Sequence, residues 1–414
     1  MFRGNVPSGE GPRRHRGSRQ LSAPRLRPDT AARACLDAGE LGLLRDEVHA
    51  LTAGPRPWAA GVVVFAGRGP VIALREAVGW AVRFGAWGGG GGVGEGAGGG
   101  GVPGSPGVPE GAVELPVSEW VPMALDTPFD LASLTKLFTS VAAVQQIERG
   151  RLGIDARVGA YLPDFPAVRR YGTTVRQLLT HTSGLRPELP LYACADDAER
   201  LELLRAEEPV GVPGAYVYSD LNMLLLQQLL ERLTGRTLDV LIHEGITRPL
   251  GMTSTDFGPC PGAAATEDQR RPWAKVDRGM LRGEVHDENA WALGGVAGHA
   301  GLFSTGQDLA VFCRTLLNGG SYGTARILGA DYVELLLDPP GLGFAVDQAW
   351  FMGELAGRGA AGHTGFTGTS LVLDRATDTF LVLLANTVHP RRRQGGSGPR
   401  ARAATRLARA VLPT

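Results

Sequence analysis

The stretch Phe129–Ser140 constrains the fold more than any other part of the sequence, because it predicts a buried helix that carries a reactive serine near its start. Ser133 and Lys136 are three residues apart, so on a helix they share one face. A serine hydroxyl needs a base within hydrogen-bond reach, and a lysine one turn away can supply one if its surroundings tune its charge. The mostly apolar run Leu137–Ile147 that follows is typical of a central core helix, which Gly150 would end.

The same pattern has a purely structural alternative. A Ser-x-x-Lys pair occurs by chance in long chains, and a serine at the start of a helix usually acts as a cap. The functional interpretation therefore depends on what the rest of the chain provides.

The charge balance and the cysteine positions argue against several classes of protein. Lys+Arg and Asp+Glu both number 42, so no net charge draws the chain to nucleic acid or to a membrane surface. The four cysteines form no Cys-x-x-Cys pair, so we expect neither a metal centre nor a disulfide framework. No apolar run in the sequence is long enough to be a transmembrane segment.

Both ends of the chain and one internal segment differ in composition from the rest. Residues 1–27 are rich in Arg, Gly, Ser and Pro and lack the apolar segment of a secretory signal, which predicts a disordered basic tail and a cytoplasmic location. Residues 85–109 predict a flexible, glycine-rich insertion, since they lack the residue order of a phosphate-binding loop. Residues 391–414 predict a basic C-terminal tail with a surface helix over Ala401–Val411. Residues 28–390 are then expected to form a single domain.

Periodicity predicts strands at both ends of this domain and helices between them. Gly61–Leu74 predicts a β-hairpin, and Gly362–Asn386 predicts two or three antiparallel strands packed on the helix that carries Ser133. Pro259–Glu284 is polar and is expected to be mostly loop. Further helical segments are predicted within Pro28–Leu51, Thr174–Leu185, Asp220–Gly235, Leu238–Ile246 and Thr305–Leu317.

Several polar residues elsewhere are candidates for a site. His181 lies in a polar turn, where we expect its ring nitrogens to hold the loop rather than to act in catalysis. Tyr218 and Asp220 mark a junction between a loop and a helix, where they either pack and cap or point a phenol into a cleft. His286–Trp291 looks like a metal cluster, but adjacent side chains rarely converge on one ion, so we expect a hydrogen-bonded loop.

Three short motifs, taken in order, resemble those of the serine β-lactamase and penicillin-binding protein superfamily. They are Ser133-Leu-Thr-Lys136, Tyr218-Ser-Asp220 and His363-Thr-Gly365. The resemblance is closest to the class C–like branch, which also holds DD-peptidases and esterases, and it spans about Ala60 to Pro390. Segments that connect the motifs are similar to that branch as well: Leu178–Leu185, Pro249–Met252 and His299–Thr305.

The resemblance implies an α+β fold, with an antiparallel sheet flanked by helices, a mostly helical lobe, and a site between them. It implies that Ser133 attacks a carbonyl to form an acyl-enzyme, and that Lys136 and Tyr218 share the proton transfers, the ammonium favouring a phenolate. The backbone N–H groups of Ser133 and Phe366 would form the oxyanion hole. No metal or cofactor is expected. The implied substrate-binding and oxyanion residues are Asp220, His363, Thr364, Gly365 and Phe366.

Two residues depart from the family pattern. Asp220 stands where the second motif usually has asparagine; a carboxylate only accepts hydrogen bonds, and it could pair with Lys136. His363 stands where the third motif often has lysine, and a histidine is charged only part of the time near neutral pH. Both changes weaken the case for β-lactam hydrolysis and leave esters, amides and D-amino-acid peptides open.

Two functions therefore stay open. The first is a serine hydrolase that acts through Ser133 on a small-molecule or peptide substrate. The second is a catalytically silent relative that binds a ligand or a partner, because one fold can host both. The intact Ser133, Lys136 and Tyr218 favour the enzyme.

Overall fold

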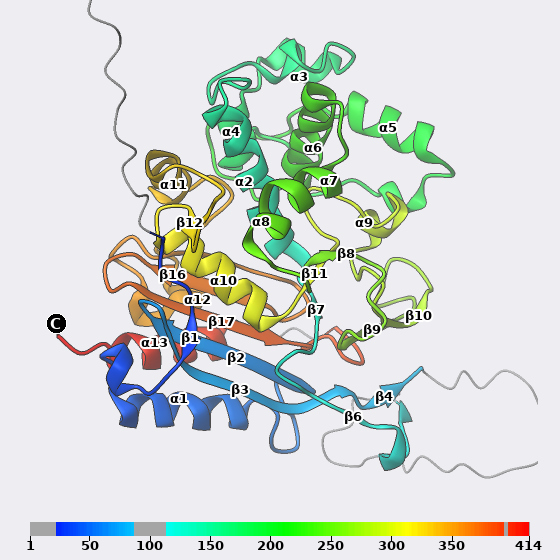
Figure 1. Ribbon diagram of the computed structural model, residues 1–414. Helices are drawn as coiled ribbons and strands as arrows, with labels where there is room; N and C mark the ends of the chain where they lie inside the picture. The colour runs from blue at the N-terminus through cyan, green and yellow to red at the C-terminus, as the bar shows by residue number, and fades with distance from the viewer. Residues whose placement is uncertain (1–21, 87–112, 393–395, 414) are drawn as a thin grey trace, which may run out of the picture.

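One large, mostly antiparallel sheet forms the base of the fold (Figure 1). The computed structural model describes residues 22–86, 113–392 and 396–413. The strand order is β1-β3-β2-β17-β16-β15-β14, with β1 parallel to β3 and the other neighbours antiparallel. These strands are β1 (Arg27–Pro28), β2 (Gly61–Arg68), β3 (Val71–Val82), β14 (Ala345–Val346), β15 (Ala361–Thr364), β16 (Ser370–Asp374) and β17 (Thr379–Ala385). The predicted hairpin and the three predicted antiparallel strands are therefore confirmed.

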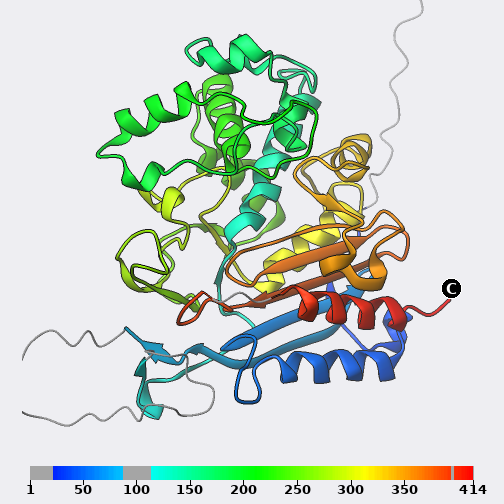
Figure 2. The same ribbon diagram turned by 180° about the vertical axis from the view of Figure 1, so that it is seen from behind.

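Helices cover both faces of this sheet, which explains why its central strands are apolar throughout. On β2, Val62 and Val64 belong to one core cluster, whereas Val63 and Phe65 belong to the other. The first cluster lies under α1 (Ala38–Ala50) and α13 (Gly398–Ala410), which run side by side on that face (Figure 2). The second lies under α10 (Gly306–Leu317) and continues into the helical lobe.

The helical lobe is built around α2 (Thr135–Glu148), which packs against α6 (Asp220–Thr234) (Figure 1). Strands β2, β16 and β17 pack on α10 rather than on α2, so the prediction that the strands pack on the Ser133 helix was wrong for this part of the sheet. Residues 135–146 of α2 are all buried, which requires that this helix has packing neighbours on every side. The other helices of the lobe are α3 (Pro166–Tyr171), α4 (Val175–Leu179), α5 (Asp197–Ala206), α7 (Leu238–Ile242), α8 (Arg248–Leu250), α9 (Glu288–Ala292) and α11 (Ala330–Leu337).

The segments that composition set apart behave differently from one another. Residues 1–21 of the predicted N-terminal tail and residues 87–112 of the glycine-rich stretch lie outside the described residues. Residues 22–27 were expected to be disordered, but Ala23 exchanges backbone hydrogen bonds with Gly323 and the Arg27 N–H donates to Pro70. These bonds add the segment to the edge of the fold, which a composition argument does not detect.

Two further expectations are corrected by the packing. Pro259–Glu284, expected to be mostly loop, contains the antiparallel pair β9 (Ala265–Gln269) and β10 (Gly279–Arg282). The predicted C-terminal helix is present as α13, but its Ala403 and Leu407 are buried in the core beneath the sheet. In the part of the chain that the structure describes, no helix combines the length and the apolarity needed to cross a membrane.

Candidate active site

The serine lies in a tight turn between a short strand and the central helix. Strand β7 (Phe129–Asp130) pairs with β11 (Leu302–Ser304) and leads into a 3₁₀ turn, Ala132–Leu134, just before α2. Ala132 has a φ of +47°, a left-handed conformation that is costly for a residue with a Cβ. The side chain of Asp130 stabilises it by accepting a hydrogen bond from the Ala132 N–H at 2.8 Å. Ser133 therefore occupies a strained, well-fixed position, which is common at functional sites.

Lys136 is held against Ser133 by three acceptors. Its Nζ donates to Ser133 Oγ at 2.8 Å and to the His299 carbonyl at 3.2 Å. Asp220 Oδ1 lies 2.8 Å from the same Nζ, so the predicted ion pair between Asp220 and Lys136 is confirmed. Burial opposes the charge of this fully buried side chain, but Asp220 and Tyr218 outweigh burial and raise the pKa of Lys136 above its usual value. The resting lysine is an ammonium.

Tyr218 completes the group around the serine hydroxyl. Its side chain interacts with both Ser133 and Lys136, and the ammonium lies 4.9 Å from the centre of its ring. Burial raises the pKa of Tyr218, and the neighbouring ammonium only partly offsets that. The resemblance implied a phenolate favoured by Lys136; the attraction is present, but the resting phenol stays protonated.

The loop that carries Tyr218 is anchored by His181. The ring nitrogen Nδ1 of His181 accepts a hydrogen bond from the Ser219 N–H at 3.2 Å, and its carbonyl accepts one from the Val217 N–H. Burial lowers the pKa of His181 to about 3, so its ring is neutral. These contacts confirm the prediction that His181 holds the loop.

The loop that follows the third motif is bonded directly to the backbone just before Ser133. Thr367 Oγ1 donates to the Asp130 carbonyl at 2.7 Å, and Thr369 Oγ1 donates to the Leu131 carbonyl at 3.0 Å. The loop between them and β15 carries Phe366, whose side chain is 56% exposed. Ser133 and Phe366 line the same pocket, and the oxyanion hole that their N–H groups would form stays a prediction.

His363 carries no charge in this site. Its Nδ1 lies 2.7 Å from the Thr364 carbonyl and donates to it. Burial, assisted by repulsion from Lys136, lowers the pKa of His363 to about 4. The residue at the place of the family's lysine therefore cannot attract an anionic substrate group at neutral pH.

A buried arginine supplies positive charge to the same pocket. Arg400, from the first turn of α13, is only 8% exposed and donates to the Gly365 carbonyl at 3.2 Å and to Ser397 Oγ at 3.1 Å. Its Nε has no hydrogen-bond partner, and no carboxylate pairs with it among the described residues. Burial alone lowers the pKa of Arg400, to about 10, so it still carries its charge. Sequence reasoning missed this residue because it lies in a segment that looked like a basic tail.

The pocket has a volume of about 1190 Å³ and opens in front of Ser133. It brings together Ser133 and Tyr218 with His363, Thr364, Gly365 and Phe366. Aromatic side chains line its outer part; these are Trp58, Tyr216 and Trp350. Asp220 and Lys136 are not among its lining residues and lie behind the serine.

A second missed feature is an ion pair behind Asp220. His299 Nε2 donates to Asp287 Oδ1 at 2.9 Å, and the ring of His299 is almost fully buried. Ligand atoms of Asp220, Asp287 and His299 lie within 4.8 Å of one another, a spacing that a cation could use. The ammonium of Lys136 already supplies a positive charge to Asp220, so we interpret the group as a chain of ion pairs. The sequence around Asp287 does not reveal this pair, because its partner His299 lies 12 residues further along the chain.

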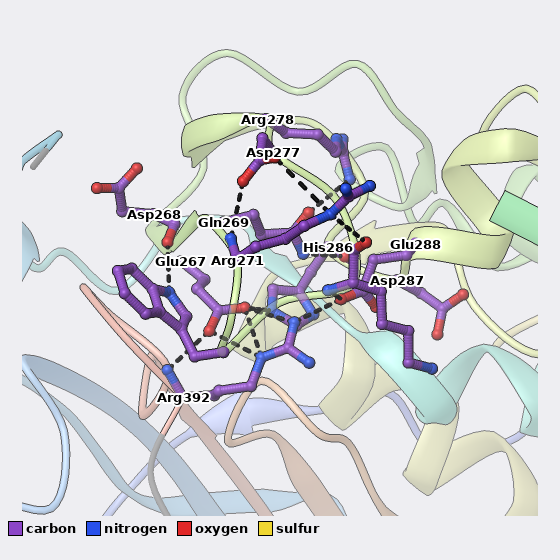
Figure 3. A network of polar contacts seen from close by, with 12 residues as sticks. Glu267, Asp268, Gln269, Arg271, Asp277, Arg278, His286, Asp287, Glu288 and Arg392 are labelled. Carbon is purple, nitrogen blue, oxygen red and sulfur yellow. Dashed lines mark hydrogen bonds and ion pairs between the residues drawn. The ribbon is translucent and has the colours of Figure 1, made fainter. Parts of the chain in front are cut away.

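The other members of the cluster predicted around Asp287 bond to separate partners, but the expected loop is wrong from Glu288 on, because Asp287 caps α9 (Glu288–Ala292). His286 Nε2 bonds to Glu267, and Glu288 pairs with Arg392 (Figure 3). Asn289 donates to the Leu189 carbonyl. Glu267, on β9, also pairs with Arg392 at 2.7 Å.

This network supports the loop of the third motif. The ring of Phe366 lies 5.5 Å from that of His286, and the guanidinium of Arg392 lies 5.4 Å from the centre of the Phe366 ring. The His286 N–H donates to Asp130 Oδ2 at 2.6 Å. The β9–β10 hairpin therefore braces both the serine turn and the proposed oxyanion loop.

Comparison with known proteins identifies the family. Residues 56–405 match the model of the Beta-lactamase family. The chain is 35% identical over 302 residues to "Putative D-alanyl-D-alanine carboxypeptidase" from Escherichia coli (strain K12), covering 64% of this chain and 70% of that protein. It is 32% identical over 306 residues to "N-acetylmuramyl-L-alanine amidase" from Bacillus subtilis (strain 168), covering 64% and 69%. The fold resembles a class C beta lactamase from Rhodobacter sphaeroides, with a TM-score of 0.61, 19% identity, and coverage of 90% and 97%.

The chain therefore belongs to the Beta-lactamase family and is a serine hydrolase. The predicted fold, a sheet flanked by helices with a helical lobe, is confirmed.

Proposed function

We propose that this protein hydrolyses an amide bond in a peptide that carries a free carboxylate, through an acyl-enzyme on Ser133. The observation that carries the proposal is the 2.8 Å contact between Lys136 Nζ and Ser133 Oγ at the floor of the pocket. In the reactive form, Tyr218 has released its proton to solvent and pairs with the Lys136 ammonium. Ser133 attacks the carbonyl as Tyr218 accepts the hydroxyl proton, and the C–N bond breaks as Tyr218 passes that proton to the leaving amine. Water then hydrolyses the acyl ester, which frees the carboxylic acid and restores Ser133. The N–H groups of Ser133 and Phe366 bind the oxyanion.

The carboxylate is assigned to Arg400. A buried guanidinium without an anionic partner is costly, and a substrate carboxylate would supply the missing partner. Thr364 and Gly365 line the intervening wall of the pocket, and the neutral His363 can bind only by hydrogen bonding. Asp220 stands where the family usually has asparagine, and a carboxylate accepts hydrogen bonds but cannot donate one. Substrates that need a hydrogen bond from the amide of that asparagine are therefore expected to be disfavoured.

The named activities of the relatives suggest two peptide classes, of which we favour a peptide ending in D-alanyl-D-alanine. Its terminal carboxylate lies close to the scissile bond. This suits a pocket in which the Gly365 carbonyl accepts from Arg400 and a Cβ on Gly365 would lie 3.4 Å from that of Ala132, the neighbour of Ser133. A muramyl peptide, the substrate type named for the Bacillus relative, is the second candidate, because the exposed Tyr216 and Trp350 at the pocket offer flat surfaces for a sugar.

The test is labelling of the intact protein, followed by hydrolysis. Mass spectrometry should show one adduct on Ser133 after incubation with a fluorophosphonate, and none in the Ser133→Ala variant. Release of D-alanine from a peptide ending in D-alanyl-D-alanine would support the favoured substrate, and release of the peptide from a muramyl peptide would support the second. Folded wild-type protein that takes no label and cleaves neither substrate would instead identify the catalytically silent relative.

A further inference from the structure

The carboxylate of Asp220 creates an electrostatic problem for the proposed mechanism. It lies 2.8 Å from Lys136 and raises the pKa values of both Lys136 and Tyr218. Ser133 must nevertheless lose its proton to this pair, so a stronger hold on the protons slows acylation. The asparagine common in the family poses no such problem, because it is neutral.

A second basic side chain, that of His299, has a ring nitrogen within 4.8 Å of an Asp220 carboxylate oxygen. His299 lies on the segment before β11, and its charge lowers the pKa of Asp220, as that of Lys136 does. Burial opposes a charge on His299, but Asp287 and Asp220 outweigh burial and raise the pKa of this histidine. The carboxylate of Asp220 therefore has two cations near it, with Asp287 paired to the second one.

The backbone ties this pair directly to the catalytic lysine. The carbonyl of His299 accepts a hydrogen bond from Lys136 Nζ at 3.2 Å, while its ring donates to Asp287 Oδ1 at 2.9 Å. Asp287 is itself fixed as the N-cap of α9, where the same Oδ1 accepts from the Ala290 N–H at 2.8 Å. A change in the His299–Asp287 pair would thus reach Lys136 in two ways. It would alter the charge of the His299 ring, and it would move the His299 carbonyl that accepts from Lys136 Nζ.

We propose that His299 and Asp287 are positioning residues of the active site, which balance the charge of Asp220. A charged His299 lowers the pKa of Asp220 more than Asp287 raises it, so the pair offsets part of the charge of the Asp220 carboxylate. Asp287 keeps the imidazolium in place and keeps it charged. The proposal rests on the proposed function only in taking Ser133 as the nucleophile.

The remaining titratable groups around the lysine do not replace this balance. His181 and His363 both face Lys136, and both are neutral because their pKa values lie at about 3 and about 4. Tyr218 is a neutral phenol at rest. The groups that face the lysine or the His299 ring are Tyr218, Asp220, His181, His363 and Asp287.

The first experiment measures the rate of fluorophosphonate labelling at Ser133 as a function of pH. In His299→Gln the charge of Asp220 is unbalanced, so the rising limb of the profile should move to higher pH, by about one unit, with about tenfold slower labelling at pH 7. Asp287→Asn should shift it in the same direction but less, because asparagine can still accept the bonds from Ala290 and His299. The matched control is Asp37→Asn, another N-cap aspartate, whose Oδ1 accepts from the Glu40 N–H of α1 away from the site.

The decisive variant is the double substitution Asp220→Asn with His299→Gln. If charge balance is the reason for the pair, removing the carboxylate should return the limb toward the wild-type position, so the two changes compensate. A double variant that carries the losses of both single variants would overturn the proposal, as would a profile that moves only in height and not along the pH axis.

A readout that needs no activity separates this proposal from the proposed function. In a histidine NMR titration, with the His299 signal assigned by its loss in His299→Gln, the ring should stay protonated at pH 7 and titrate at lower pH in Asp287→Asn. If wild-type protein takes no fluorophosphonate label but His299 titrates as expected, only the proposed function is contradicted. A His299 that titrates at its ordinary pH and ignores Asp287→Asn would contradict the charge balance itself.

Discussion

Arg400 reaches the pocket from the far end of the chain, and its charge has no carboxylate partner among the described residues. A hydrogen bond from a charged donor contributes about 1.5–3 kcal/mol, which corresponds to roughly 10–100-fold in binding. The residue is therefore expected to decide between substrates with and without a carboxylate, while Ser133 and Lys136 decide the rate of the chemical step.

Arg400→Met should raise KM for a peptide with a free C-terminal carboxylate by roughly 10–100-fold and leave KM for the corresponding peptide amide unchanged. Steady-state kinetics on the two peptides measures the difference. Arg402→Met is the matched control, because Arg402 pairs with Glu47 at 2.9 Å on the surface. Equal effects of Arg400→Met on both peptides would exclude a carboxylate contact.

At the scale of single residues, the sequence identified the three motifs but not their surroundings. Ser133, Lys136 and Tyr218 have a characteristic spacing, and the ion pair between Asp220 and Lys136 followed from chemistry alone. Arg400 could not be found, because its function comes from a burial that only the packing of α13 creates.

The β9–β10 hairpin shows at the scale of elements how a polar sequence becomes part of the interior. Residues 266–269 of β9 are all polar and buried, and a polar run without alternation gives no strand signal. Their partners come from elsewhere: Arg392 follows the last strand of the sheet, and His286 follows the hairpin (Figure 3). By contrast, β2 and β17 were predictable because their stabilisation comes from apolar side chains that the sequence displays.

Glu267→Gln should destabilise the protein by about 3 kcal/mol, since it leaves the buried end of Arg392 with an incomplete partner. It should also slow labelling of Ser133, because Arg392 and His286 support Phe366. Denaturant unfolding and the labelling rate measure the two effects. Glu208→Gln, which weakens an ion pair with Arg170 whose two side chains are both exposed, should cost at most a few tenths of a kcal/mol. Similar losses of stability and labelling rate in both variants would show that the buried network contributes no more than an exposed ion pair.

For the whole molecule, we propose that the domain extends beyond the predicted boundary at residue 390. α13 packs against α1 and closes the core beneath the sheet, and the family match runs to residue 405. Arg402 and Arg406 of this helix pair with Glu47 and Glu40 of α1, whereas Arg400 is buried at the pocket. The density of arginines in the sequence made the segment look like a tail.

Acid should unfold this protein well before its carboxylates titrate. Burial lowers the pKa of His181 to about 3 and those of His363 and His389 to about 4, against about 6.5 in an unfolded chain. Below pH 6.5 the unfolded chain therefore binds more protons, so stability falls as the pH falls, by about 1.4 kcal/mol per pH unit for each histidine. His299, whose pKa is raised, has the opposite sign and offsets part of the loss.

Thermal unfolding between pH 7.5 and 4.5 measures this slope. His389 bridges the Phe84 N–H and the Thr266 carbonyl, so His389→Gln should lower the melting temperature at pH 7 and flatten its pH dependence. A melting temperature that is constant between pH 7 and 5 would show that these rings accept protons in the folded state.

The pairing of β2 with β17 has a consequence for how the protein is made. Residues 62–68 find their sheet partners at residues 379–385, at opposite ends of the chain. At a synthesis rate of about 5–20 residues per second, the β2–β3 hairpin waits on the order of half a minute on the ribosome before its neighbour exists. During that time the apolar edge of β2 is open, and contacts between such distant segments form slowly. Newly made chains should therefore depend on chaperones that shield the N-terminal hairpin until the last strand emerges.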